Sequence, residues 1–226
     1  MREIVLDTET TGLDPKVGHR VIEIGCIELD NHMPTGRSLQ LYINPERDVP
    51  EESIKIHGIT EDFLKDKPPF RKICQQFLDF IAQDTLIIHN AEFDIRFLNA
   101  ELAREGKPPI PIDRAIDTVK MARKRFPGAQ ANLDALCRRF EIDLSARVVH
   151  GALLDCELLA AVYLELSGGR QPGLALNKNA QTPDGADSLV RASRRHRAPR
   201  AHAATQEEIS AHHAFLDGLK DPLWRS

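Results

Sequence analysis

This chain of 226 residues lacks the features that mark small secreted domains and membrane proteins. It has only four cysteines, and none forms a C-x-x-C pair, so neither a structural zinc site nor a disulfide framework is indicated. No apolar run is long enough to span a membrane, and no apolar signal segment follows Met1. We therefore expect a cytoplasmic protein with reduced core cysteines at Cys26, Cys74, Cys137 and Cys156.

A net excess of basic charge is also absent from the larger part of the chain. Residues 168–226 hold nine Lys/Arg and six Asp/Glu, which leaves 21 basic and 28 acidic residues in the first 167. This acidic body argues against binding nucleic acid through bulk charge, although an acidic site filled with metal ions could still bind phosphate. With 42% hydrophobic and 28% charged residues, the composition fits one sizeable α/β core followed by a tail.

Period-two and helical patterns alternate along the body. The predicted strands are residues 3–8, 20–29, 38–44, 85–90 and 115–119, and the second and third are joined by a turn-rich stretch at 30–37. The predicted helices are residues 68–83, 91–106, 118–126, 132–140 and 152–166. A β-meander followed by parallel crossover units predicts an α/β fold: a mixed five-stranded sheet flanked by helices, with the first strand central.

Two acids, Asp7 and Glu9, end the first predicted strand in the stretch VLDTETTGLD. Because they are two residues apart, both side chains leave the sheet on the same face. Like charges in a poorly solvated place repel each other, and burying them is unfavourable unless an opposite charge lies between them. This position favours a functional role for the pair.

Three further residues can join them at the carboxyl end of the central strand. Asp94 lies in the first turn of the helix after strand 85–90, Asp155 lies in the last long helix of the body, and His150 precedes it by five residues. Taken singly, each has an ordinary interpretation, as a helix-dipole partner or a surface histidine. Together, the four acids suit two Mg²⁺ or Mn²⁺ ions, and His150 could take a proton from the attacking water.

Three motifs, LDTETTGLD, HNAEFDIRFL and HGALLDCELL, occur in this order. They resemble the DEDD superfamily of 3′–5′ exonucleases, in the variant whose last motif is H-x-x-x-x-D. The resemblance implies a ribonuclease-H-like fold and two-metal hydrolysis of phosphodiesters. It also implies metal ligands at Asp7, Glu9, Asp94 and Asp155, with His150 as the general base.

Within this superfamily the chain looks most like the proofreading subunits of bacterial DNA polymerase III, from VIEIGCIEL through FPGAQANLDALCRRFEID to the terminal LWRS. That resemblance implies removal of mispaired nucleotides from the single-stranded 3′ end of primer DNA. Without it, Glu52 would be interpreted as a helix-start acid and His57 as a loop histidine. The residues it implies as holding the terminal nucleotide are Asp7, Glu9, Thr10, Gly12, Glu52, His57 and Asp155.

The tail after the exonuclease domain, residues 1–169, has parts in the order expected of a tether. In QPGLAL, within residues 170–176, the residues Gln171, Leu174 and Leu176 have the spacing of a peptide that docks on the sliding clamp; an exposed linker with two leucines is the alternative. Residues 177–206 hold few large apolar side chains and predict a flexible linker. Its basic stretch 191–200 fits either phosphate contacts or a solvated linker.

Apolar spacing returns in residues 207–226 and ends near Trp224. This segment is expected to bind the polymerase (alpha) subunit, as the resemblance implies. Two other functions stay open: an RNA exonuclease of the same superfamily, and a non-catalytic adaptor that binds polymerase and clamp. The adaptor is disfavoured because all five catalytic positions are filled. The sequence does not tell whether a small accessory subunit binds the body.

Overall fold

The computed structural model describes residues 1–145, 150–169 and 203–219. The chain divides into two units, Met1–Leu174 and Ala175–Ser226. The first unit holds the sheet, and the second contributes one described helix, α9, Gln206–Asp217. Among the described residues, no helix is both long and apolar enough to cross a membrane.

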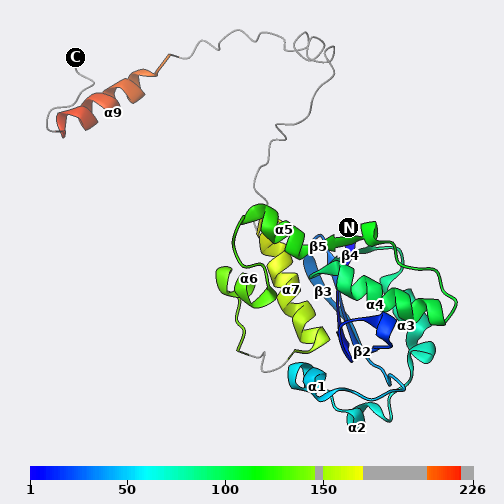
Figure 1. Ribbon diagram of the computed structural model, residues 1–226. Coiled ribbons are helices and arrows are strands. Elements are labelled where there is room, and N and C mark those ends of the chain that lie inside the picture. The colour runs from blue at the N-terminus through cyan, green and yellow to red at the C-terminus, as the bar shows by residue number, and fades with distance from the viewer. Residues whose placement is uncertain (146–149, 170–202, 220–226) are drawn as a thin grey trace, which may run out of the picture. The chain divides into compact units, whose positions relative to one another are not determined.

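A mixed sheet of five strands forms the centre of the first unit (Figure 1). Its strand order is β3-β2-β1-β4-β5, with β1 antiparallel to β2 and parallel to β4, and β4 parallel to β5. This confirms the predicted five-stranded architecture and the central place of the first strand. The strands are β1 Arg2–Thr10, β2 Val21–Asp30, β3 Met33–Tyr42, β4 Thr85–Ile88 and β5 Ala115–Asp117.

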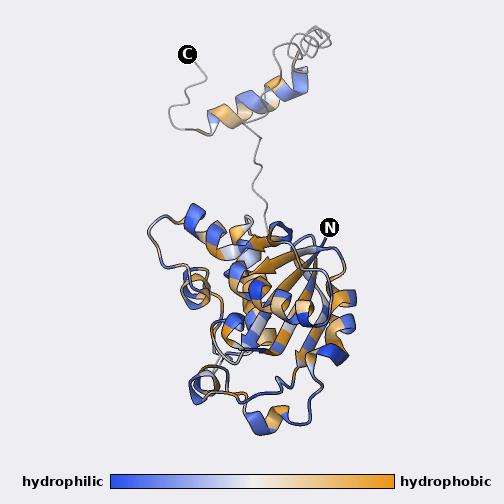
Figure 2. Ribbon diagram, turned by 45° about the vertical axis from the view of Figure 1, so that its right-hand side comes forward, coloured by the Kyte–Doolittle hydropathy of each residue, from blue (hydrophilic) through white to orange (hydrophobic). Residues whose placement is uncertain are grey.

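Helices cover both faces of this sheet, as Figure 1 shows. The alternation of β1 explains which core each face joins: Ile4 and Leu6 pack in the cluster with α3 and α4, whereas Val5 packs with α5, α6 and α7. In Figure 2 the strands are coloured mostly as hydrophobic, while hydrophilic residues occur along the outer helices. The helices are α3 Phe70–Ile81, α4 Ala91–Arg104, α5 Thr118–Arg125, α6 Leu133–Arg139 and α7 Ala152–Leu166.

The connection between β2 and β3 is shorter than the predicted stretch 30–37. Only Asn31 and His32 separate the two strands, and both have positive φ values, 49° and 67°. Two successive left-handed residues form a tight hairpin turn. Pro34 and Gly36 resemble loop residues, but β3 is an edge strand, where the missing N–H of a proline is tolerated.

Two short helices, α1 Glu51–His57 and α2 Glu61–Leu64, were not predicted. They contribute Ile54 and Leu64 to a small apolar cluster with Ile22 of β2. Seven and four residues are too few for helical periodicity to stand out from a loop. Two 3₁₀ turns, Pro15–Val17 and Ile112–Arg114, complete the described elements of this unit.

The fifth strand also ends earlier than the predicted 115–119. The carboxylate of Asp117 accepts hydrogen bonds from the backbone N–H groups of Val119 and Lys120, so it caps α5, which begins at Thr118. All four cysteines are buried and unpaired, which confirms the expectation of reduced core residues.

Candidate active site

Four acids from three elements meet at one place in the first unit. Asp7 and Glu9 belong to β1, whereas Asp94 and Asp155 lie in the first turns of α4 and α7. The charges of Glu9, Asp94 and Asp155 all act on Asp7. The structure therefore brings together the four carboxylates that the sequence singled out, although they are up to 148 positions apart in the chain.

These carboxylates lie in a poorly solvated environment. Burial, followed by repulsion from the neighbouring acids, raises the pKa of Asp7 well above its usual range. Burial likewise raises the pKa of Asp94 to about 7, although the hydroxyl of Thr8 donates a 2.7 Å hydrogen bond to its Oδ1. Acids held this way need positive charge between them to stay ionised near neutral pH.

A divalent cation fits the chemistry of these side chains. Glu9, His150 and Asp155 offer ligand atoms that all lie within 4.8 Å of one another. The Nδ1 atom of His150 is 3.2 Å from Oδ2 of Asp155, and the imidazole is 48% exposed while the carboxylate is 6% exposed. Carboxylate oxygens are the donors that Mg²⁺ and Mn²⁺ prefer, so the residues present fit such an ion.

A cleft of about 430 Å³ gives access to this site. Asp7, His150 and Asp155 line it, together with side chains of the α6 region. Asp94 is 2% exposed and does not line the cleft, so it approaches the other acids from the protein interior. Three of the five residues predicted as catalytic or metal-binding are therefore reachable from this opening.

Two residues of β2 that the sequence analysis did not single out hold the beginning of α7. The buried carboxylate of Glu23 accepts a 3.1 Å hydrogen bond from the backbone N–H of Ala152, one of the donors that a helix leaves unpaired at its start. Gly25 pairs with Asp7 in the sheet, and a Cβ atom there would lie 2.4 Å from the backbone carbonyl carbon of Ala152. The helix that carries Asp155 can approach β1 because β2 presents no side chain at this point.

The predicted substrate residues Thr10 and Gly12 lie at the end of β1 and in the turn that follows it. The hydroxyl of Thr10 donates a 2.6 Å hydrogen bond to the carbonyl oxygen of Gly12. A Cβ atom on Gly12 would lie 2.3 Å from Cε1 of His19, so the imidazole of His19 packs where a side chain would otherwise stand. An alanine at this position would require the His19 ring to move.

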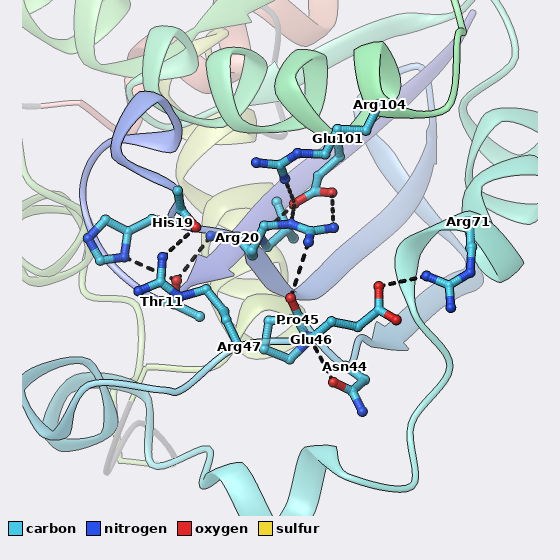
Figure 3. A network of polar contacts seen from close by, with 12 residues as sticks. Thr11, His19, Arg20, Asn44, Pro45, Glu46, Arg47, Arg71, Glu101 and Arg104 are labelled. Carbon is cyan, nitrogen blue, oxygen red and sulfur yellow. Dashed lines mark hydrogen bonds and ion pairs between the residues drawn. The ribbon is translucent and has the colours of Figure 1, made fainter.

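A network of polar contacts, shown in Figure 3, anchors that turn to α4. The backbone N–H of Thr11 bonds to the carbonyl oxygen of Arg20, and the Thr11 hydroxyl accepts from the Arg20 N–H and lies 3.1 Å from Nδ1 of His19. The Arg20 guanidinium in turn binds both carboxylate oxygens of Glu101, which is 1% exposed. The sequence indicated this pair only weakly, because Glu101 is a single acid on the apolar face of a predicted helix.

The last two predicted substrate residues lie on α1. His57 ends this helix and is buried; its Nδ1 accepts a 3.0 Å hydrogen bond from the N–H of Ile59, so the proton is on Nε2. This Nε2 is a buried donor for which the described part of the chain supplies no acceptor. Burial and the charge of His150 lower the pKa of His57, which places the two rings near each other. Glu52 is exposed on α1, and no described contact joins it to the acids.

Known proteins resemble this chain over almost its whole length. The Exonuclease family model matches residues 4–163. DNA polymerase III subunit epsilon of Rickettsia felis is 50% identical over 223 residues, 97% of both chains, and that of Escherichia coli is 42% identical over 237 residues, 100% of this chain and 98% of the relative. The chain belongs to the epsilon-subunit family of exonucleases.

Solved structures agree with the epsilon-family fold. The nuclease domain of 3′hExo, described as a DEDDh family member and bound to rAMP, superposes with a TM-score of 0.64 at 22% identity and covers 74% of this chain and 92% of its own. Exonuclease X, in complex with 5′ overhanging duplex DNA, has a TM-score of 0.59 at 25% identity, over 73% of this chain and 90% of its own. The ribonuclease-H-like fold expected from the motifs is confirmed, and exonucleases of this family depend on divalent metal ions.

Most predicted tail residues lie outside the described residues: Gln171, Leu174, Leu176, Trp224 and the basic stretch 191–200. Of the segment 207–226, the structure describes residues 207–219, most of which belong to α9, and the N-cap Thr205 of this helix forms a capping box with Glu208. Ile209 and Phe215 on α9 are 37% and 63% exposed, and Leu219 just after the helix is 40% exposed, so this segment presents apolar surface.

Proposed function

We propose that the protein is the proofreading 3′–5′ exonuclease subunit of a bacterial replicative DNA polymerase and removes mispaired 3′-terminal nucleotides. The observation that supports this most directly is the meeting of Asp7, Glu9, Asp94 and Asp155 beside His150. The printed names of the epsilon-subunit relatives point to the same role. Hydrolysis of a phosphodiester is the reaction that such an acidic site with a neighbouring base performs best.

The four carboxylates would hold two divalent ions, Mg²⁺ or Mn²⁺. Bound ions neutralise the phosphate and stabilise both the attacking and the leaving oxygen of the displacement. The chain itself keeps Asp7 and Asp94 poorly solvated. Few water molecules would therefore compete with a cation for these carboxylates. Thr8 orients Asp94 through its 2.7 Å hydrogen bond.

His150 would act as the general base. Its exposed ring lines the cleft, and the buried Asp155 carboxylate 3.2 Å from Nδ1 orients it. If Nδ1 carries the proton and donates it to Asp155, Nε2 is the nitrogen that accepts a proton from the attacking water. A carboxylate behind the imidazole also stabilises the imidazolium that forms.

His57 would bind the 3′-terminal nucleotide. Its Nε2–H is buried and lacks an acceptor within the described residues, and leaving such a donor unpaired costs about 1–3 kcal/mol. An oxygen of the terminal sugar or phosphate would supply the missing acceptor. Glu52 on the same helix, with Thr10 at the end of β1 and Gly12 in the turn after it, would contact the same nucleotide.

The partners proposed for this function are the polymerase alpha subunit, through residues 207–226 and Trp224, and the sliding clamp, through Gln171, Leu174 and Leu176. The exposed apolar residues of α9 support the first assignment. Residues 177–206 would act as the linker between the two attachments. A flexible tether raises the local concentration of the exonuclease at a frayed primer end to roughly the millimolar range. A small accessory subunit is a further candidate partner for the body, residues 1–169.

Purified protein tested on mismatched primer DNA and on single-stranded RNA addresses this function directly. We expect metal-dependent release of mispaired 3′ nucleotides from DNA, and its near-complete loss in Asp7→Ala with the fold retained. His150→Ala should lose rate at every pH while still binding metal, as a direct metal titration would show. Preferential degradation of RNA would favour the alternative, an RNA exonuclease. Wild-type cleavage by Asp7→Ala would remove the metal-site hypothesis.

A further inference from the structure

Two neighbouring clefts form one longer surface feature on the side of α5 and α6. The cleft over the acids and a second one of about 500 Å³ share two lining residues, His89 and Asn132. His89 follows β4, and its Nδ1 is 2.8 Å from the hydroxyl of Thr118 at the start of α5. Asn132 caps α6 by accepting a hydrogen bond from the N–H of Ala135. Because these residues line both openings, the clefts lie side by side, and we refer to the two together as the groove.

The charge changes sign along this groove. The first cleft is lined by three acids, Asp7, Asp134 and Asp155, and by one arginine, Arg138. The second contains Lys120 and Arg123, three residues apart on α5 and therefore on one face of that helix. Of the two acids beside them, Asp117 already accepts hydrogen bonds from the N-terminal N–H groups of α5, which leaves Glu92.

These three cations are exposed, and no hydrogen bond, ion pair or ring contact of their side chains is found within the described residues. Two arginines near them in the sequence, by contrast, contact other parts of the body. The guanidinium of Arg139 lies 4.5 Å from the centre of the Phe126 ring, and Arg125 donates to the carbonyl oxygen of Leu166 at 2.9 Å. The groove therefore presents three positive side chains that make no such contact within the described residues.

We propose that this groove binds the backbone phosphates of the single strand that lie on the 5′ side of the scissile phosphate. This inference rests on the proposed exonuclease function. Arg138, at the acidic cleft, would hold a phosphate next to the reacting one, and Lys120 with Arg123 would hold phosphates further along the strand. The catalytic carboxylates repel every phosphate that is not neutralised by metal, so a strand entering this site needs cations just beyond it. Such contacts carry no sequence information, which suits an enzyme that must accept any 3′ end.

The test compares two substrates. One is a single-stranded oligothymidylate of about 12 nucleotides, long enough to reach the second cleft, and the other is the p-nitrophenyl ester of thymidine 5′-monophosphate, which has no phosphate beyond the scissile one. The groove variants are Arg138→Gln and the double variant Lys120→Gln/Arg123→Gln. The matched controls are Arg139→Gln and Lys124→Gln, each adjacent to a groove residue but outside both clefts.

For the groove variants we expect KM for the oligonucleotide to rise about three- to tenfold for each lost contact, with kcat changed much less. The slope of log KM against log salt should fall by about 0.7 for each phosphate contact removed. The loss should shrink when the mononucleotide ester replaces the oligonucleotide, and thermal melts of the groove variants should match that of the unmodified protein.

Two failures can be told apart. If the unmodified protein hydrolyses neither substrate, the proposed exonuclease function fails. If it hydrolyses both, but the groove variants keep the KM and salt slope of Arg139→Gln and Lys124→Gln, the phosphate groove is wrong and the function stands. An equal loss on the oligonucleotide and on the ester would also overturn the groove, because it would show that these cations act at the scissile phosphate itself.

Discussion

The guanidinium of Arg20 pairs side-on with the carboxylate of Glu101: Nε donates to Oε1 and Nη2 to Oε2, both at 2.7 Å. The Arg20 backbone is at the same time hydrogen-bonded to Thr11. The pair thus connects α4 to the turn that follows Thr10 and carries Gly12. We interpret it as a positioning contact for that turn.

Removing the charge of Glu101 tests this positioning role. Glu101→Gln breaks a largely buried bidentate pair and should destabilise the protein by about 2–4 kcal/mol, measured by urea denaturation. Because the turn would loosen, KM for a DNA strand should rise more than kcat falls. Glu46→Gln is the matched control, since its ion pair with Arg71 is about half exposed on both sides and its loss should leave stability and KM unchanged. Equal effects of the two substitutions would contradict the assignment.

The stability of the metal-free protein should depend on pH in an unusual direction. Asp94 has a pKa of about 7 in the folded state, above its ordinary value of 3.8, so the folded state binds the proton more tightly than the unfolded chain does. The free energy of unfolding should therefore decrease as pH rises from about 4 to about 7, by on the order of 2–3 kcal/mol between pH 5 and pH 8. The raised pKa of Asp7 acts in the same direction.

Denaturation with urea in the presence of a chelator, at pH 5 and pH 8, checks this prediction. Asp7→Asn should flatten the pH dependence and stabilise the metal-free protein at pH 8, because one repelling charge is removed. Saturating Mg²⁺ or Mn²⁺ should restore the stability of the unmodified protein at pH 8. The exposed Asp113→Asn serves as a control and should change neither curve. A stability that rose steadily from pH 5 to pH 8 without metal would contradict the buried-acid interpretation.

Gly25→Ala should damage the active site from the neighbouring strand. The added Cβ would lie 2.4 Å from the carbonyl carbon of Ala152, so the start of α7, with Asp155, must move. We expect a loss of about 1–3 kcal/mol in stability and at least about tenfold in kcat. Gly151→Ala is the stability control, because no atom lies within 4 Å of a Cβ built there. If Gly25→Ala kept full activity, the close packing of β2 against α7 would not be what places Asp155.

The tail should decide where the enzyme works without changing its chemistry. Truncation after Gly169 should leave cleavage of free single strands within about twofold and abolish co-purification with the polymerase subunit, because the tether is gone.

Within the full chain, Phe215→Asp should weaken polymerase binding, since this side chain is 63% exposed on α9. Gln171→Ala with Leu174→Ala should affect only the clamp. Size-exclusion mixing with each partner distinguishes these results, and tight binding of the truncated body to the polymerase would reject the tether.

Sequence alone was enough for the long, strongly patterned elements and for the acids. The apolar strands and the amphipathic helices carry periodicities of two and 3.6 residues, so their ends were predicted to within about two residues. The exception is the start of β3, which lies five residues before the predicted position 38. Asp7 and Glu9 stood out because charge at the end of an apolar strand conflicts with burial. The three motifs then brought Asp94, His150 and Asp155 into the same hypothesis.

Only the tertiary structure decided the features that depend on contacts between distant segments. The tight turn at Asn31 and His32 replaced a predicted loop because β3 is an edge strand, a property of sheet order and not of its own residues. The roles of Glu23 and Gly25 appear only when α7 is seen to begin against β2, more than 120 positions later in the chain. Whether Arg138 or Arg139 faces the cleft is likewise a matter of helix orientation, which tertiary packing sets and local sequence does not.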